Sequence, residues 1–352
     1  MGEQTHAARV AIVGPVYPFR AGVAYCTTRL AEELHADVIS FMRQYPKRLY
    51  PGGDDIDPTL PRANAAFILD ILNPLTWLRA RRRLREYDAV IFVWWIWVWA
   101  IPYRLMMTGL RRVVLQCHNI GEKEPAWWKR ALTNIVLRRA NVLVVHANSE
   151  AEEAWRRTHR DVVKAFLPVH EIGAPASSPA GPPASRRPTA LFFGHIRPFK
   201  GLDIALEAWK KLTTDVTLMV AGEPWFGFTP EAQPNVRFDL RFIPDAEVAK
   251  VFEAADVVIA PYRAEAQSGV AMTAFHFGIP VIATRVGGLP DIIDDHNGIL
   301  VPPEDSDALA RAVDEFFTTR DRAAMARAAA ASARRFSWAE YSAIISRLVQ
   351  RP

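Results

Sequence analysis

Cysteine is scarce in this 352-residue chain, and its two copies, Cys26 and Cys117, cannot build a disulfide framework. Neither cysteine stands at metal-ligand spacing to another cysteine or to a histidine, so no zinc site is expected. The sequence also lacks a Walker loop and a serine or cysteine nucleophile elbow. We expect both thiols to be buried side chains of a protein of the reducing cytosol.

Long apolar runs are missing as well. The longest uncharged stretch, AVIFVWWIWVWAIPY, lies between Asp88 and Arg104 and contains Pro102. It is shorter than the roughly 20 residues that a membrane-spanning helix needs. We expect a buried strand over Ala89–Trp95 that continues into a helix, with some of the tryptophans facing a pocket or the lipid interface. The first residues, MGEQTHAARVAIVGP, hold no apolar segment of the signal-peptide type, and a cytoplasmic location is expected.

Charge is unevenly distributed along the chain. Residues 1–172 hold 24 Lys and Arg against 17 Asp and Glu, a balance of +7, whereas residues 173–352 hold 19 against 21, a balance of −2. The first half also carries 8 of the 11 tryptophans and an arginine cluster on a predicted helix: Arg79, Arg81, Arg82, Arg83 and Arg85. This half suits the surface of an anionic membrane, although a solvated helix face explains any single cluster equally well. Nucleic acid is not an expected partner, because no nucleic-acid-binding signature is present.

Apolar runs alternate with helical patterns twice, on either side of a linker. In the first half the expected strands are Val10–Val13, Val38–Phe41, Ala89–Trp95, Val113–Cys117, Val142–His146 and Lys164–Leu167. After the Gly-, Ala-, Pro- and Ser-rich residues 173–188 they are Ala190–Phe193, Thr217–Ala221, Val236–Leu240, Val257–Ala260 and Val281–Thr284. Such alternation predicts an α/β protein with parallel sheets that helices cover on both faces. The stretch Gln44–Arg62 is expected to be a long loop.

The stretch DVVIAPYRAEAQSGVAMTAFHFGIPVIATRVGGLP, from Asp256 to Pro290, predicts a strand, a polar loop, a helix and a second strand. Ligands of such units bind outside the carboxyl ends of the strands. Gln267, Ser268 and Gly269 stand at the expected start of the helix, where free backbone N–H groups suit a phosphate. A carboxylate just before that start, Glu265, suits sugar hydroxyls better than phosphates.

These residues resemble the nucleotide-sugar-binding half of the GT-B glycosyltransferases of family 4, a large group of retaining hexosyltransferases. The family signature has two glutamates separated by seven residues, then Ala-Met-Ala-x-Gly-x-Pro-Val-Ile and Gly-Gly-x-x-Glu. Glu265 matches the first glutamate, and the tail is matched by Gly278, Pro280, Val281, Ile282, Gly287 and Gly288. The second glutamate, which holds the nucleotide ribose in the family, falls on Thr273, and the last falls on Asp291. Either Thr273 takes over the ribose contact, or the nucleotide is held differently.

The resemblance extends to the loop GHIRPFKG, residues 194–201, which is similar to the family motif Gly-Arg-Leu-x-x-x-Lys-Gly. It implies that Lys200 binds the donor diphosphate, and Arg197 can reach the same anion because both side chains stay cationic. His118 follows the strand Val113–Cys117 and matches the family's histidine that contacts the transferring sugar. The catalytic residues implied are therefore His118, Glu265, Arg197 and Lys200.

The remaining implied contacts fall into two groups. The donor-binding residues are Gly22, Arg197, Lys200, Glu265, Gln267, Ser268, Gly269, Val270 and Thr273. The acceptor-binding residues are Arg20, Trp94, Trp95 and Asn119. His146 also ends an expected strand, and a structural role for it is as plausible as a functional one. No cofactor and no metal are implied, because side chains and helix starts hold the diphosphate.

The implied architecture is GT-B, two Rossmann-like domains with parallel sheets facing across a cleft. Its parts are an acceptor-binding domain (1–172), the linker (173–188), a nucleotide-sugar domain (189–335) and a last helix (336–352) that crosses back to the first domain. The implied function is transfer of a hexose from a nucleoside diphosphate sugar to a hydroxyl of a glycan, lipid-linked or small-molecule acceptor, with retention, in polysaccharide or glycolipid synthesis. The enzyme is then cytoplasmic or peripheral on an anionic membrane. The alternatives are another sugar-nucleotide enzyme of this fold, such as an epimerase, or a non-catalytic scaffold.

Overall fold

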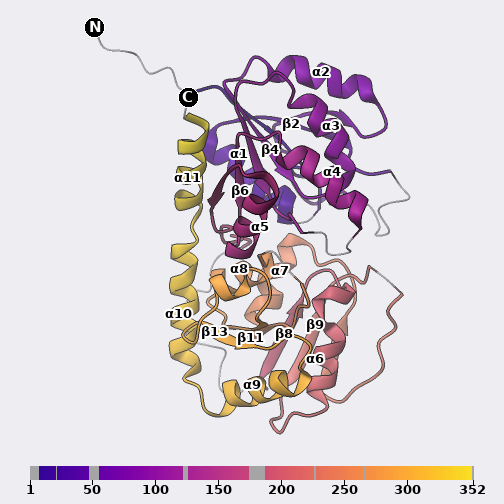
Figure 1. The fold of residues 1–352 in the computed structure, drawn as a ribbon. Helices are drawn as coiled ribbons and strands as arrows, with labels where there is room; N and C mark the ends of the chain where they lie inside the picture. The colour runs from indigo at the N-terminus through magenta and orange to yellow at the C-terminus, as the bar shows by residue number, and fades with distance from the viewer. Residues whose placement is uncertain are drawn as a thin grey trace. The chain divides into compact units, whose positions relative to one another are not determined.

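The computed structural model describes residues 8–20, 22–46, 55–121, 126–173, 187–225, 227–264 and 267–350. The chain divides into two compact units (Figure 1). Unit 1 comprises Met1–Phe166 together with Trp338–Pro352, and unit 2 comprises Leu167–Ser337.

Within its described residues, unit 1 is built on a parallel sheet of seven strands in the order β3-β2-β1-β4-β5-β6-β7. The strands are β1 (Val10–Val13), β2 (Asp37–Arg43), β3 (Ala66–Asp70), β4 (Ala89–Trp94), β5 (Val113–Cys117), β6 (Val142–Val145) and β7 (Asp161–Lys164). Every residue of β4, β5 and β6 is buried, which is the pattern of central strands covered on both faces.

Helices cover both faces of this sheet. They are α1 (Gly22–Leu34), α2 (Pro74–Leu84), α3 (Ala100–Met106), α4 (Trp127–Leu137), α5 (Asn148–Thr158) and α11 (Trp338–Gln350), and a short 3-10 turn, η2 (Trp97–Trp99), precedes α3. Helices α2, α3, α4 and α5 pack side by side in that order, whereas α1 packs on α11 (Figure 1). The buried Gln116 of β5 donates to the Tyr341 hydroxyl of α11 over 2.7 Å, which ties this last helix to the sheet.

The tryptophan-rich run after β4 lies mostly inside unit 1. Trp94 and Trp99 are 1% and 0% exposed and pack with Phe92 and Tyr103 in the hydrophobic core. Trp95 and Trp97 are half-buried. The run therefore fills the core between β4 and α3, and its two fully buried members are not available to a lipid interface.

Within its described residues, unit 2 is built on a second parallel sheet, of six strands in the order β10-β9-β8-β11-β12-β13. The strands are β8 (Thr189–Phe193), β9 (Thr217–Ala221), β10 (Val236–Asp239), β11 (Val257–Ala260), β12 (Val281–Thr284) and β13 (Gly298–Val301). The helices are α6 (Leu202–Trp209), α7 (Asp245–Glu253), α8 (Gly269–His276), α9 (Ser306–Thr318) and α10 (Arg322–Arg335), with 3-10 turns η3 (Pro198–Lys200) and η4 (Leu289–Asp291).

The α/β class and the two parallel sheets are confirmed, but one expected strand is displaced and two further strands were not predicted. The strand expected over Lys164–Leu167 lies instead at Asp161–Lys164, because the edge strand β7 pairs with β6 from Asp161 to Lys164. Strands β3 and β13 were not expected from the sequence. Both are short runs whose strand character comes from pairing with a neighbour, β2 and β12 respectively. The long loop expected over Gln44–Arg62 lies partly outside the described residues.

Candidate functional site

The loop that joins β8 to α6 in unit 2 carries the two predicted cations. It begins at Gly194, ends at Gly201 and includes the turn η3. Gly201 has a φ of +69°, and a Cβ atom there would clash with the carbonyl oxygen of Pro261 at the end of β11. Glycine at 201 therefore lets this loop pack closely against the neighbouring strand. A Cβ on Gly194 would lie 3.6 Å from Val270 Cγ2, so the loop begins beside the first turn of α8.

Both cations rest on aromatic rings at the carboxyl edge of the sheet. Arg197 Cζ lies 3.8 Å from the centroid of the Trp225 ring, which follows β9. Lys200 Nζ lies 3.8 Å from the centroid of the buried Tyr262 ring, which follows β11. The negative face of an aromatic ring attracts a cation without neutralising it. The rings therefore help to hold the two positive charges in place at this edge of the sheet.

Arg263, which sequence reasoning did not single out, fixes the shape of this loop. Its guanidinium donates to both carboxylate oxygens of Asp203 at 2.8 and 2.7 Å, to the Pro198 carbonyl at 2.7 Å and to Glu304 Oε1 at 2.6 Å. Its backbone N–H donates to the carbonyl of Phe199 over 2.8 Å. The side-chain hydrogen bonds that Arg263 donates, those to Asp203 foremost, raise its pKa, and the same contact lowers the pKa of Asp203. The only signal in the sequence was an arginine within the loop that follows β11.

Helix α8 presents its N-terminus at the same edge of the sheet. Ser268 caps it, because its Oγ accepts from the Ala271 N–H over 3.3 Å. Gln267 is buried; its Oε1 accepts from the Leu167 N–H over 2.7 Å. Gln267 Nε2 is buried and makes no hydrogen bond within the described part of the chain. This amide nitrogen is a donor held at a helix start, which suits an anionic group.

The other residues of unit 2 that were predicted to bind the sugar nucleotide differ in exposure. Gly269 and Val270 form the first turn of α8 and are partly exposed. Thr273 is 4% exposed and donates its hydroxyl to the Gly269 carbonyl over 2.9 Å, so only the acceptor lone pairs of that oxygen remain for a ligand. Glu265 lies outside the described residues.

In unit 1, His118 and Asn119 follow β5 at its carboxyl end. The backbone N–H of His118 donates to the Trp94 carbonyl over 2.8 Å, which holds this turn beside the end of β4. The ring of His118 lies 5.1 Å, centroid to centroid, from the ring of His146, which follows β6. His146 Nδ1 lies 2.8 Å from the Ala165 carbonyl, and burial lowers its pKa to about 4. The neutral His146 therefore carries its proton on Nδ1 and offers Nε2 as an acceptor.

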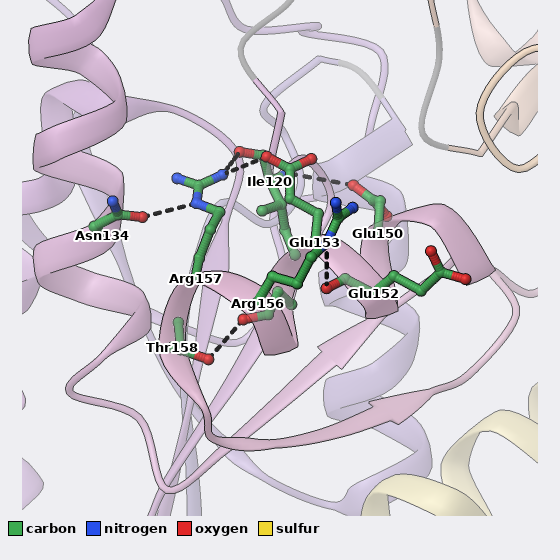
Figure 2. Close-up of polar contacts among 9 residues, drawn as sticks. Ile120, Asn134, Glu150, Glu152, Glu153, Arg156, Arg157 and Thr158 are labelled. Carbon is green, nitrogen blue, oxygen red and sulfur yellow. Dashed lines mark hydrogen bonds and ion pairs between the residues drawn. The ribbon is translucent and has the colours of Figure 1, made fainter.

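The segment just after His118 is clamped by helix α5 (Figure 2). The buried guanidinium of Arg157 donates to Ile120 O at 2.8 Å, to Asn134 Oδ1 at 2.7 Å and to Glu153 Oε1 at 3.1 Å. Glu150 Oε1 accepts from the Ile120 N–H over 3.2 Å. Both backbone groups of Ile120 are thereby tied to α5, two residues after His118. These side chains were not found from the sequence, because the clamp joins residues 30 and 37 positions apart.

The remaining predicted residues of unit 1 lie at or after the ends of β1 and β4, which are adjacent strands of the sheet, and β4 is also adjacent to β5. Arg20 lies in the loop after β1, where its N–H donates to the Asp55 carbonyl over 2.9 Å, and Gly22 is the exposed first residue of α1. Trp95 is half-buried and donates from Nε1 to the Tyr45 hydroxyl over 2.7 Å. Trp94 lies in the core. The structure thus brings His118, Asn119, Trp95 and the loop at Arg20 to one edge of the sheet of unit 1, and Arg197, Lys200 and the start of α8 to one edge of the sheet of unit 2.

Among the described residues, no three His, Cys, Asp or Glu side chains lie close enough together to hold a metal ion jointly. Both cysteines are buried free thiols, and burial raises their pKa values. Neither is an activated nucleophile, since activation lowers a thiol pKa.

The family model described as glycosyl transferases group 1 matches residues 187–319. The D-inositol 3-phosphate glycosyltransferase of Saccharomonospora viridis is 33% identical over 237 residues, 58% of this chain and 54% of that protein, so the chain spans about half the length of that relative. The protein of the same name from Mycolicibacterium smegmatis is 30% identical over 312 residues, 80% of this chain and 70% of that protein. The chain belongs to the group 1 glycosyltransferases.

Solved structures define the fold of this group 1 glycosyltransferase. Sucrose-phosphate synthase from Thermosynechococcus elongatus superposes with a TM-score of 0.76 at 18% identity, covering 97% of this chain and 98% of that one. The Anabaena protein HepE in complex with UDP-glucose gives a TM-score of 0.71 at 18% identity, with coverages of 97% and 98%. At such identities the likeness is one of fold alone. It confirms the expected GT-B fold of two Rossmann-like units.

Proposed function

We propose that this protein transfers a hexose from a nucleoside diphosphate sugar to a hydroxyl group of an acceptor, with retention of the anomeric configuration. Membership of the group 1 glycosyltransferases and the fold shared with a UDP-glucose complex support this proposal. The observation that carries it is the loop of Arg197 and Lys200. Two cations stand on aromatic rings beside the first turn of α8, an arrangement suited to a diphosphate.

In the proposed complex, unit 2 holds the donor. Arg197 and Lys200 bind the diphosphate. Further hydrogen-bond donors to the sugar nucleotide come from the start of α8, at Gln267, Ser268, Gly269 and Val270. Glu265 accepts from the hydroxyls of the hexose, and Thr273 or another group contacts the ribose. From unit 1, the exposed start of α1 at Gly22 adds a further donor contact, and His118 hydrogen-bonds the transferring sugar.

The proposed reaction forms a bond between the acceptor oxygen and the anomeric carbon and breaks the bond between that carbon and the diphosphate oxygen. Attack on the same face retains the configuration, and the acceptor proton passes to an oxygen of the departing diphosphate. Negative charge grows on that leaving group, where positioned cations stabilise the transition state most. Arg197, Lys200 and the start of α8 supply this positive charge, so the proposed reaction uses no metal.

The acceptor is held by unit 1 in this proposal, through Arg20, Asn119 and Trp95. The relatives are named for D-inositol 3-phosphate, which makes that compound the first small-molecule acceptor to test. A glycan or a lipid-linked acceptor is the other class, in the synthesis of a polysaccharide or glycolipid. Peripheral attachment to an anionic membrane is also part of the proposal, through a face of unit 1 separate from the proposed acceptor contacts.

The test begins with thermal shift against UDP, GDP, ADP and their sugars, because a ligand that binds the folded state raises the melting temperature. Nucleotide release is then measured with D-inositol 3-phosphate and with lipid-linked acceptors, and product NMR gives the anomeric configuration. Arg197→Ala and Lys200→Ala should each lower kcat/KM. The expected loss of transition-state stabilisation is roughly 2–4 kcal/mol for each variant, the scale of one positioned charge contact. Lys210→Ala is the matched control, since Lys210 is an exposed lysine paired with Glu207 at the far end of α6.

Three outcomes would contradict the proposal. Transfer at a near-normal rate in both Arg197→Ala and Lys200→Ala would show that this loop does not hold the leaving group. Turnover of the sugar nucleotide without any acceptor would indicate an epimerase-like enzyme. Weak donor binding without nucleotide release, across all acceptors, would indicate a scaffold.

A further inference from the structure

Large apolar side chains are exposed on one layer of helices in unit 1. Among the described residues, ten large apolar side chains are exposed, and all ten lie in unit 1. Seven of them stand on or just before α2, α3 and α4, among them Leu72 and Leu75 at 59% exposure, Ile101 at 54% and Trp127 at 83%. Exposed apolar residues gathered in this way mark an interaction surface rather than an ordinary solvated one.

The three helices form one continuous surface, called here the α2–α4 face. They pack side by side in Figure 1, and side chains join them. Arg81 Nε of α2 donates to the Thr108 carbonyl just after α3 over 2.9 Å, and the rings of Trp97 in η2 and Trp128 in α4 meet edge to face at 4.7 Å. Each helix follows a strand of the same parallel sheet, so all three begin at the same edge. Most of the exposed apolar residues lie in or near their first turns.

The charges on the three helices have a single sign. The spans of α2, α3 and α4 (PLTWLRARRRL, AIPYRLM and WWKRALTNIVL) contain seven Lys and Arg residues and no Asp or Glu. Arg79, Arg82 and Arg130 are exposed. Arg85 and Arg138 cap α2 and α4 and extend the positive charge beyond the ends of both helices.

We propose that the α2–α4 face docks this protein on the surface of an anionic lipid bilayer. Leucine and tryptophan enter the boundary between headgroups and acyl chains, while arginine and lysine meet the lipid phosphates. Nucleic acid offers the exposed leucines no comparable environment. A second copy of the chain would bring one strongly positive face against another. Among the described residues no helix is long and apolar enough to cross a membrane, so the attachment is to the surface.

This docking deepens the peripheral attachment in the proposed function, and it rests on the α2–α4 face alone rather than on the transfer reaction. Its test therefore needs no substrate. The full-length protein is floated with vesicles of phosphatidylcholine alone and of equal parts phosphatidylcholine and phosphatidylglycerol, over a series of salt concentrations. Binding should require phosphatidylglycerol and weaken as salt rises. UDP thermal shift on each variant verifies the fold and the donor site independently.

Two variants separate the two halves of the proposal. Arg79→Ala/Arg82→Ala/Arg130→Ala should weaken binding at low salt by about a hundredfold, because each basic residue near an anionic surface contributes roughly a fivefold gain. Arg81 is left in place because it bonds to the Thr108 carbonyl. Leu72→Ser/Leu75→Ser/Leu78→Ser should remove the binding that persists at high salt. The matched control, Arg311→Ala/Arg327→Ala/Arg334→Ala, removes the same charge from exposed positions of unit 2 and should bind vesicles normally.

A site-specific readout comes from vesicles that contain brominated phosphatidylcholine, which quenches tryptophan at the bilayer surface. Quenching should be seen in the unmodified protein and should drop in Trp127→Phe. The proposal is overturned if anionic vesicles fail to bind at low salt, or if the control triple loses as much binding as the arginine triple. It is equally overturned if an oligonucleotide or an acidic protein binds through the same arginines while vesicles do not. None of these results bears on UDP binding or transfer, so the two proposals fail separately.

Discussion

Arg263 determines where the cationic loop of unit 2 lies, although it is not itself expected to touch the donor. One planar guanidinium holds the start of α6 through Asp203, the turn η3 through the Pro198 carbonyl, and Glu304 beyond β13. A lysine carries the same charge but has no fork of N–H groups, so it cannot make all of these contacts at once. Arg263 is therefore a positioning residue for Arg197 and Lys200.

Replacing Arg263 should weaken catalysis without removing a contact to substrate. Arg263→Ala is expected to raise the donor KM and lower kcat, with a loss of up to about a hundredfold in kcat/KM, the scale of a misplacement of roughly 1 Å. Arg263→Lys should recover only part of this loss because the forked contact is missing. Steady-state kinetics with a varied donor and saturating acceptor measure both constants.

Arg320→Ala is the control for this comparison. Arg320 is also ion-paired, with Glu315 at 2.8 Å, but it follows α9, far along the chain from the loop. Wild-type kinetics in Arg263→Ala, or an equal loss in Arg320→Ala, would show that the network of Arg263 supports the fold only.

At the scale of elements, α5 fixes the chain segment that follows His118. Arg157 and Glu150 lie on this helix, and between them they bond both backbone groups of Ile120 (Figure 2). Burial lowers the pKa of the Arg157 guanidinium, and the nearby Glu153 carboxylate counteracts that change. A buried charge of this kind is retained at a cost in desolvation, which its hydrogen bonds offset.

Removing the Arg157 guanidinium should loosen this segment. Arg157→Met leaves Ile120 O and Asn134 Oδ1 without their donor, and each buried group left unpaired costs about 1–3 kcal/mol of folding stability. We expect kcat to fall more than KM changes, because the displaced His118 is the residue proposed to hydrogen-bond the transferring sugar. Glu150→Gln keeps an amide oxygen that accepts from the Ile120 N–H, so it should lower stability and kcat less than Arg157→Met does.

The chain offers a matched control on the same helix. Arg156 is exposed, and its Nε donates to the Glu152 carbonyl within the same helix (Figure 2). Arg156→Met should leave both melting temperature and kcat near their original values. If Arg157→Met lowers the melting temperature but leaves the kinetics unchanged, the clamp has no part in positioning His118.

At the scale of the whole molecule, each unit contains a buried neutral histidine that makes the fold sensitive to acid. Burial lowers the pKa of His146 in unit 1 from 6.5 to about 4. In unit 2, burial and then the charge of His276 lower the pKa of His170 from 6.5 to about 4. Below pH 6.5 the histidines bind protons in the unfolded state but stay neutral in the folded state. The free energy of unfolding therefore decreases as the pH falls from 6.5 toward 4.

Calorimetry between pH 7 and pH 4 measures this dependence. At pH 5 each histidine should have cost its unit about 2 kcal/mol of stability relative to pH 7. His146→Gln keeps a donor for the Ala165 carbonyl and does not titrate, so it should flatten the acid loss of the transition assigned to unit 1. An unchanged acid profile in His146→Gln and His170→Gln would assign the loss to other groups.

The regular elements were largely predictable because their sequence patterns are local. Strands β1, β5, β9, β11 and β12 occupy the predicted residues. Strands β3 and β13 were missed because three or four apolar residues in a row show no period of their own, and pairing with a neighbouring strand defines them. The strand at β7 was misplaced toward Ala165–Leu167, where three more apolar residues follow its end.

The candidate site was predictable where one loop carries it. Arg197 and Lys200 stand three residues apart in a single motif, so a sequence pattern could find both. Arg263 joins Asp203 and Glu304, which lie 60 and 41 residues away. Arg157 reaches Ile120 across 37 residues. Residues such as Arg263 and Arg157, which position other residues, have no sequence motif of their own. The predicted roles of the site residues remain to be tested by the variants above.

Composition and short periods are enough to define the α/β class, the two parallel sheets and the basic, tryptophan-rich character of the first half. Which tryptophans face solvent depends on the tertiary packing. Trp94 and Trp99 lie in the core, whereas Trp127 is 83% exposed on α4, the helix that also carries Lys129 and Arg130. Exposure depends on which helices pack over a side chain, and that packing is set by strand order across the sheet rather than by neighbours in the chain.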